Sequence, residues 1–210
     1  MTELIPFAKY MSEDDIRQMK ENTVKRTYKA GAHIHGGDAD CLGILLITKG
    51  TTRTYMMSEE GREITLFRMK EGEWCVLSAS CIMPAITFDV FIDAETDVEL
   101  LQINASWFQE FQNRNVHAEN FVYKIAIEKF SEVMWVMEQV MFMKMDKRLA
   151  IFLLDEGPTI SMTHDEIARH MGSAREVISR MLKYFSAEGY VSLSRGTIHV
   201  EDRNALMQFL

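Results

Sequence analysis

One stretch of the sequence decides the fold of the last third of the chain. Residues 163–189 have the sequence THDEIARHMGSAREVISRMLKYFSAEG. Thr163 and Glu166 have the spacing of a capping box, in which a hydroxyl and a carboxylate satisfy each other's backbone amides at a helix start. Ser173 and Glu176 repeat this spacing ten residues later. The stretch therefore predicts two short helices in succession.

The two predicted helices, at 164–171 and at about 174–187, have apolar faces that can pack against each other. Gly172 lies between them, where a tight turn needs a residue without Cβ. Residues 190–200, YVSLSRGTIHV, predict two short strands joined at Arg195–Gly196. A helix–turn–helix followed by a β-hairpin is the winged form of that motif.

The exposed face of the second helix is predicted to be basic. Residues 172–187 contain three basic residues and one acidic residue, a local charge of +2 in a chain of formal net charge −8. An acidic chain does not coat nucleic acid by bulk charge, but salt at 0.1 M screens distant charges over about 10 Å. Arginine binds guanine O6 and N7, and glutamate accepts from cytosine N4. The predicted DNA-contacting residues are Arg175, Glu176, Ser179, Arg180, Lys183, Ser173, Thr163 and Arg195.

Three motifs of this region resemble the C-terminal domain of CRP/FNR-type bacterial transcription regulators. They are E-I-A-x-x-x-G in the first helix, x-R-E-x-x-S-R in the second and L-S-R-G in the hairpin. The resemblance extends over the full length, and it is most specific in the last third. It implies a homodimer that contacts RNA polymerase and binds a palindromic site in double-stranded promoter DNA, with TGA-like half-sites roughly 34 Å apart. It also assigns Glu176, Ser179 and Arg180 to base-contacting positions, with Arg175 as an additional candidate.

The resemblance implies an α+β fold. The expected order is an N-terminal jelly-roll β-barrel similar to cyclic-nucleotide-binding domains, a long dimerisation helix, and a C-terminal winged helix–turn–helix. The residues support it, because short apolar segments alternate with turn-like glycines between Val24 and Ile103, a pattern typical of a barrel or jelly roll. We expect a sensor barrel at 1–104, a dimerisation helix and linker at 105–144, and a DNA-binding domain at 145–210.

The segment from about Ala105 to Lys144 has helical periodicity and contains neither glycine nor proline. Its apolar residues lie on most sides of the helix, which predicts burial on most sides. One interpretation is the central helix of a monomeric core. The other is a helix with one face on the barrel and another on its twin in a homodimer, through residues on or beside a coiled-coil-type a/d seam. Those residues are Phe130, Val133, Met137, Val140 and Met141.

The signal that such a regulator senses is not evident from the sequence. Regulators of the cyclic-AMP type carry Gly-Glu-Leu, whose glutamate holds the ribose, followed by an Arg-Ser pair whose arginine pairs with the phosphate. Gly72 and Glu73 match, but Trp74 replaces the leucine and no arginine follows before Phe91. The iron–sulfur type carries an N-terminal cysteine cluster, and the first forty residues contain no cysteine. We expect neither cyclic AMP nor that cluster.

The stretch CVLSASC, from Cys75 to Cys81, offers other signals. A helix beginning here would lower the thiol pKa of Cys75 and favour a redox pair, or the two thiols could share a metal with Cys41. Haem with a histidine or methionine ligand is a further candidate. The alternative is that both cysteines are small buried apolar residues. The effector stays unknown, and the candidate effector-pocket residues are Glu73, Trp74, Cys75, Ser78 and Cys81.

A metal-dependent enzyme of the cupin type is the main competing hypothesis. His33 and His35, in a predicted barrel, have the spacing of a metal-binding pair, to which Asp38 or Asp40 could add a carboxylate. The third histidine on a later strand is missing, because the next one is His117 on the predicted long helix. We therefore expect neither enzyme activity nor a metal site.

Two less specific alternatives concern the basic helix face. It could be a solvated surface whose turn serves packing only, or the chain could be a dimeric adaptor that binds no DNA. Both leave the combination of Arg175, Glu176 and Arg180 with a wing unexplained.

Bulk features predict a cytoplasmic protein without membrane association. No apolar run approaches the roughly 18 residues of a membrane helix. The first twenty residues have neither the basic nor the apolar segment of a signal peptide. Three scattered cysteines are too few for a disulfide framework.

Overall fold

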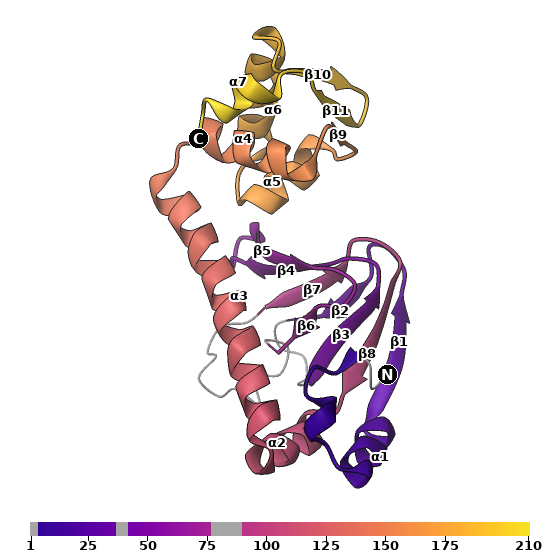
Figure 1. Ribbon diagram of the computed structural model, residues 1–210. Helices are drawn as coiled ribbons and strands as arrows, with labels where there is room; N and C mark the ends of the chain where they lie inside the picture. The colour runs from indigo at the N-terminus through magenta and orange to yellow at the C-terminus, as the bar shows by residue number, and fades with distance from the viewer. Residues whose placement is uncertain (1–3, 37–41, 77–89) are drawn as a thin grey trace. The chain divides into compact units, whose positions relative to one another are not determined.

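The computed structural model of the chain contains two compact units (Figure 1). The structure describes residues 4–36, 42–76 and 90–210. The first unit comprises Met1–Met56 and Leu66–Val133, and the second comprises Met57–Thr65 and Met134–Leu210. Each unit has its own apolar core.

In the described residues, two four-stranded sheets form the barrel. The first is antiparallel throughout, in the order β1 (Thr23–Tyr28), β8 (Val98–Ile103), β3 (Ile44–Lys49) and β6 (Trp74–Cys75). The second has the order β2 (His33–His35), β7 (Phe91–Ala94), β4 (Thr52–Met57) and β5 (Glu63–Met69). Buried residues of both sheets form one apolar cluster, which includes Leu45, Ile47, Leu66, Phe67, Ile92 and Leu100. The predicted jelly-roll-like domain is confirmed.

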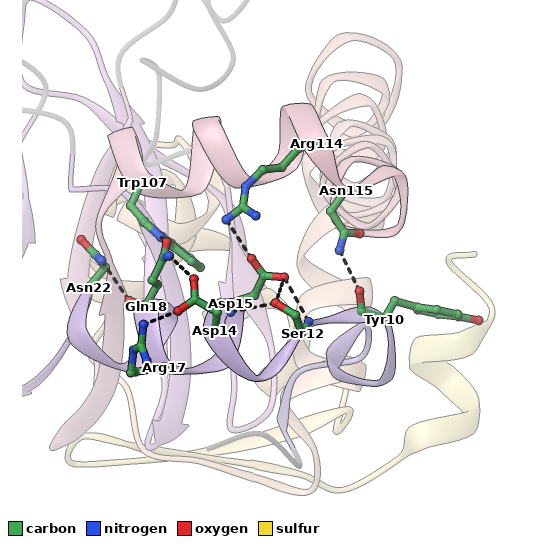
Figure 2. Close-up of polar contacts among 10 residues, drawn as sticks. All are labelled: Tyr10, Ser12, Asp14, Asp15, Arg17, Gln18, Asn22, Trp107, Arg114 and Asn115. Carbon is green, nitrogen blue, oxygen red and sulfur yellow. Dashed lines mark hydrogen bonds and ion pairs between the residues drawn. The ribbon is translucent and has the colours of Figure 1, made fainter.

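A polar cluster joins two helices beside the barrel (Figure 2). The helices are α1 (Glu13–Glu21), which follows a 3-10 turn η2 (Ala8–Tyr10), and α2 (Ala105–Arg114). Asp15 and Ser12 form a capping box at the start of α1. The Asp15 carboxylate also pairs with Arg114 of α2 at 2.8 Å, and the Trp107 indole of α2 donates to the Gln18 side chain of α1 at 3.2 Å. Side chains of α2 therefore fix the position of α1.

The predicted helical region contains a break that its periodicity does not show. After α2 the backbone of Asn115 leaves the helical conformation, with φ −132° and ψ 99°. The Asn115 carboxamide oxygen then accepts from the amides of His117 and Ala118 at 3.1 and 3.2 Å, which begins α3 (Val116–Phe142). Within the described ranges, α3 and the other helices lack the length of apolar sequence needed to cross a membrane.

Helix α3 has two apolar faces. Side chains on one face pack into the clusters of the first unit: Ala118, Val122, Ile125, Ala126 and Val133. The other face is an exposed stripe, here called the outer seam, of Tyr123, Ile127, Phe130, Met134, Met137 and Met141. Their spacing of four and three residues is that of a coiled-coil seam. Val133 differs from the expected register because it contacts the barrel cluster, and Val140 is exposed beside the seam.

The second unit contains a winged helix–turn–helix, as predicted. Its elements are α4 (Met145–Glu156), β9 (Thr159–Ile160), α5 (His164–Met171), α6 (Arg175–Ala187), β10 (Val191–Ser194), β11 (Thr197–Val200) and α7 (Arg203–Met207). Strand β9, which the sequence did not predict, pairs with β11 and widens the wing into a three-stranded sheet. The core brings together Leu149, Leu153, Ile167, Ile178, Leu182, Phe185, Val191 and Ile198.

Candidate nucleic-acid interface

The start of α5 is fixed by the predicted capping box. The Thr163 hydroxyl accepts from the Glu166 amide at 3.2 Å. The Glu166 carboxylate accepts from the Thr163 amide at 2.6 Å and from its hydroxyl at 2.8 Å. These hydrogen bonds from Thr163, the backbone one first, hold the pKa of Glu166 below its usual value. The box thus places an ionised carboxylate in the first turn of α5, where the helix dipole favours it.

The turn between the two helices corrects one prediction. Gly172 adopts the left-handed conformation at φ +61°, as expected of a glycine there. Ser173, however, does not cap α6. Its amide donates to the Ala168 carbonyl at 2.9 Å, so its backbone closes the end of α5. The N-cap of α6 is Ala174, which has no side-chain acceptor, and the predicted Ser173–Glu176 capping box does not form.

Helix α6 separates a buried face from a polar one. Ile178, Leu182 and Phe185 are fully buried in the unit's core. The opposite face carries the predicted DNA-contacting residues: Arg175, Glu176, Arg180 and Lys183 are exposed and Ser179 is half-buried. The wing residue Arg195 is exposed, at the turn between β10 and β11. The three cations on α6 are therefore accessible to an anionic ligand.

A hollow joins the starts of both helices to the wing. It has a volume of about 450 Å³. Its lining residues are Met162, Thr163, His164, Asp165, Arg175, Ser194, Gly196, Thr197 and Ile198. The hollow brings Thr163 and Arg175 together with wing residues on either side of Arg195, whereas the other predicted contact residues do not line it. The Arg175 guanidinium at the wall of this hollow can bind an oxyanion, although Asp165 also lines it.

His164 is a polar residue of this region that the sequence prediction missed. Its Nδ1 lies 2.9 Å from the Ser179 hydroxyl oxygen, which links the first residue of α5 to α6. Burial, followed by the nearby cations Arg175 and Lys183, lowers the pKa of His164 below its ordinary value. The only sequence signal was a histidine directly after the Thr163 cap, and spacing does not show its partner fifteen residues away.

Arg148 of α4 supports the turn from inside the unit. It is 8% exposed, and its guanidinium Nη2 donates to the Met171 carbonyl at the end of α5. Burial lowers the pKa of Arg148. A cation at the C-terminal end of a helix is placed where the helix dipole favours it.

Of the five candidate effector-pocket residues, Glu73, Trp74 and Cys75 lie in the described part of the chain. Glu73 is exposed, and its carboxylate accepts from the Lys70 amide at 2.9 Å. Trp74 and Cys75, adjacent on β6, belong to different apolar clusters: Trp74 meets Phe121 of α3 edge-on, and Cys75 lies in the cluster between the sheets. Cys75 is a strand residue and does not begin a helix. Three candidates of the effector hypotheses lie outside the described residues, namely Cys41, Ser78 and Cys81.

The histidines of the cupin hypothesis have different surroundings. His33 is exposed, and its Nδ1 lies 2.5 Å from an Asp93 carboxylate oxygen. His35 is 9% exposed, and the pairing of β2 with β7 is irregular between the two histidines. Asp38 and Asp40 lie outside the described residues. Within 4–36, 42–76 and 90–210, no three His, Cys, Asp or Glu side chains gather as a metal site would require.

Comparisons with known proteins agree with this geometry. Residues 147–209 match the Crp-like helix-turn-helix domain family. The crystal structure of a proposed transcriptional regulator of the crp/fnr family from Eubacterium rectale superposes with a TM-score of 0.94. It has 40% sequence identity, over 99% of this chain and 98% of that one.

Two curated proteins of Thermus thermophilus are more distant relatives. The cyclic AMP receptor protein of that organism is 24% identical over 85% of this chain and 84% of its own length. The transcriptional regulator SdrP is 23% identical over 77% of this chain and 81% of its own length. The similarity to both extends beyond the helix–turn–helix.

Proposed function

The chain belongs to the CRP/FNR family of transcriptional regulators and is a DNA-binding regulator of transcription. We propose that it binds a palindromic promoter site as a homodimer. In this proposal α6 enters the major groove and RNA polymerase is contacted at the promoter. The β-barrel receives a signal whose chemistry is not assigned.

The polar face of α6 is the single observation that carries the DNA-binding mode. Arg175, Arg180 and Lys183 are exposed there in a chain of net charge −8. A recognition helix contacts bases with the side chains of its N-terminal part, where Arg175, Glu176 and Ser179 lie. The hollow between α5, α6 and the wing, with Arg175 at its wall, supports a phosphate contact next to the bases.

The outer seam of α3 supports the homodimer. Six large apolar side chains from Tyr123 to Met141 are between 43% and 66% exposed. Exposed apolar residues at coiled-coil spacing are typical of a helix that pairs with a copy of itself. A two-fold axis would relate the recognition helices of the two chains, so that each contacts one half-site of a palindrome.

Selection from a random DNA pool tests this proposal. We expect the purified chain, at a stated salt concentration, to enrich a palindrome with two half-sites. Arg180→Ala should weaken binding to that site by about 5- to 150-fold and relax one base position, because arginine contributes about 1–3 kcal/mol of base discrimination. Lys144→Ala removes an exposed cation outside the α6 face and should leave base preference unchanged.

Thiol-reduced and air-oxidised samples run in parallel would separate the signal from the DNA contact. A palindrome from one sample only would make the redox state the signal. The same palindrome from both samples would exclude the redox state as the signal. Enrichment that is identical for wild type and Arg180→Ala would contradict the assignment of α6 as the base-contacting helix.

A further inference from the structure

The contact between His164 and Ser179 connects a titratable side chain to the predicted base-contacting helix. Ser179 lies on the polar face of α6 and is half-buried. His164 is the first residue of α5, and its Nδ1 is 2.9 Å from the Ser179 Oγ. The contact crosses from one helix of the motif to the other, so it is a tertiary feature of this particular sequence.

The tautomer and the protonation of His164 together decide which partner donates in this hydrogen bond. A neutral imidazole has one N–H donor and one acceptor nitrogen, whereas an imidazolium has two donors. When Nδ1 is the acceptor, the Ser179 hydroxyl donates its hydrogen bond to His164 and presents only lone pairs to other groups. When Nδ1 carries a proton, Ser179 accepts it and its own O–H is available to another group.

We propose that His164 is a positioning residue that sets the direction of the Ser179 hydroxyl and thereby the class of base that Ser179 selects. With an accepting Nδ1, Ser179 favours a base amino group, that of adenine or cytosine. With a protonated imidazole, Ser179 favours a base acceptor, such as thymine O4 or guanine O6. The inference rests on the proposed function, because it assumes that Ser179 faces a base edge.

The charged groups around His164 support a neutral imidazole in the free protein at neutral pH. Arg175 and Lys183 of α6 act on it, and with burial they lower its pKa. Asp165 on its own helix also lines the hollow. The wing residues that line the hollow carry no titratable side chain. The imidazole is therefore protonated only as the pH falls through a value below 6.5, the ordinary pKa of the group.

The test compares base preference at one position over a range of pH. Fluorescence anisotropy at constant salt would measure the affinities for four duplexes that differ at the base pair whose preference Ser179→Ala relaxes. For wild type, the ratio of affinities for the amino-bearing and acceptor-bearing bases should change about 2- to 10-fold between about pH 5 and pH 8, the range of one neutral hydrogen bond. His164→Gln, which does not titrate, should give a ratio independent of pH.

Two further variants make the test specific. In Ser179→Ala the ratio of affinities for the two classes of base should not depend on pH. The double variant Ser179→Ala/His164→Gln should give the same ratio as Ser179→Ala. His199→Gln is the matched control. His199 is another histidine of the second unit, and its Nδ1 lies 3.2 Å from the hydroxyl of Thr159 rather than from a residue of α6. His199→Gln should keep the wild-type change in ratio, even where overall affinity shifts.

An NMR titration of the DNA-free wild type keeps the test decisive if His164→Gln does not fold. The pKa of His164 should differ between wild type and Ser179→Ala, because the hydroxyl is its hydrogen-bond partner. An identical pKa, or a pH-independent base ratio in wild type, would overturn the inference while leaving sequence-selective binding intact. Absence of selective binding to any duplex would overturn the proposed function, and the inference with it.

Discussion

At the scale of single residues, Arg148 shows how one buried cation organises the helix–turn–helix. Its guanidinium donates to the Met171 carbonyl, and burial lowers its pKa. Its Nε is buried without a hydrogen-bond partner. The contact positions the end of α5 but costs desolvation, so the cation adds little net stability.

Two substitutions of Arg148 separate these contributions. Arg148→Met keeps the length of the side chain and removes the buried charge, so the free energy of unfolding should change by less than about 1 kcal/mol. Both variants remove the donor to the Met171 carbonyl, a loss that relief of the buried charge offsets, but Arg148→Ala also leaves a cavity and should cost about 2–4 kcal/mol. Urea denaturation measures both. Arg203→Ala is the control, since the exposed Arg203 donates to the Leu154 carbonyl and its loss should cost little. Equal losses for Met and Ala would show that the charge itself stabilises the turn.

The contact residues illustrate which single-residue roles the sequence could predict. Thr163 and Glu166 were predictable because their partners are three positions apart and a capping box has one geometry. Ser173 has the same spacing to Glu176, but its amide donates to the Ala168 carbonyl at the end of α5. The N-cap of α6 is therefore Ala174, one residue later than predicted. The partnership of His164 with Ser179 depends on how α5 crosses α6, which local spacing does not encode.

At the scale of elements, Asp15 ties α1 to α2 and carries a pH-dependent prediction. Burial raises the pKa of its carboxyl, but hydrogen bonds from Ser12 and the Arg114 guanidinium lower it more, so it lies below its ordinary value of 3.8. The carboxylate therefore stabilises the fold fully above the unfolded pKa, and this contribution is lost as the pH falls through the lower folded pKa. Asp15→Asn should reduce the free energy of unfolding at pH 7 by about 1 kcal/mol.

Urea midpoints as a function of pH measure this effect. The difference between wild type and Asp15→Asn should shrink below pH 3.8, where protonation removes the same charge from wild type. Asp14→Asn is the matched control, because Asp14 is exposed and its carboxylate accepts from Arg17 and Gln18 of its own helix α1. A difference that persists unchanged in acid would contradict the electrostatic role of Asp15.

The same elements show where periodicity succeeds and where it fails. The strands, α5, α6 and the wing were predictable, because apolar alternation and turn glycines such as Gly172 are local signals. The break at Asn115 was not, because it interrupts a helical pattern with a residue that helices tolerate and is visible only through its capping bonds. The opposite surroundings of Trp74 and Cys75 were not predictable either, since the two are neighbours in sequence but belong to different clusters.

At the scale of the whole molecule, the outer seam of α3 connects assembly to DNA binding. A single recognition helix contacts one half-site, and a second copy of the chain supplies the other half of a palindrome. The seam residues from Tyr123 to Met141 extend over about 27 Å of helix, at 1.5 Å per residue. A paired helix of this length would bury the apolar side chains that are exposed in one chain.

Phe130→Glu tests this assembly, because a carboxylate in the middle of the seam would be buried against its own copy. We expect a species of 24.3 kDa in sedimentation instead of one twice as large. Affinity for the full palindrome should fall by about 100-fold or more, because the second half-site no longer benefits from a tethered partner. Gln139→Glu adds the same charge to α3 away from the seam and should leave both properties unchanged. If Phe130→Glu stayed dimeric with a wild-type circular dichroism spectrum, the homodimer would have to use another surface. If it became monomeric but kept its affinity for the palindrome, two-fold recognition of the site would be wrong.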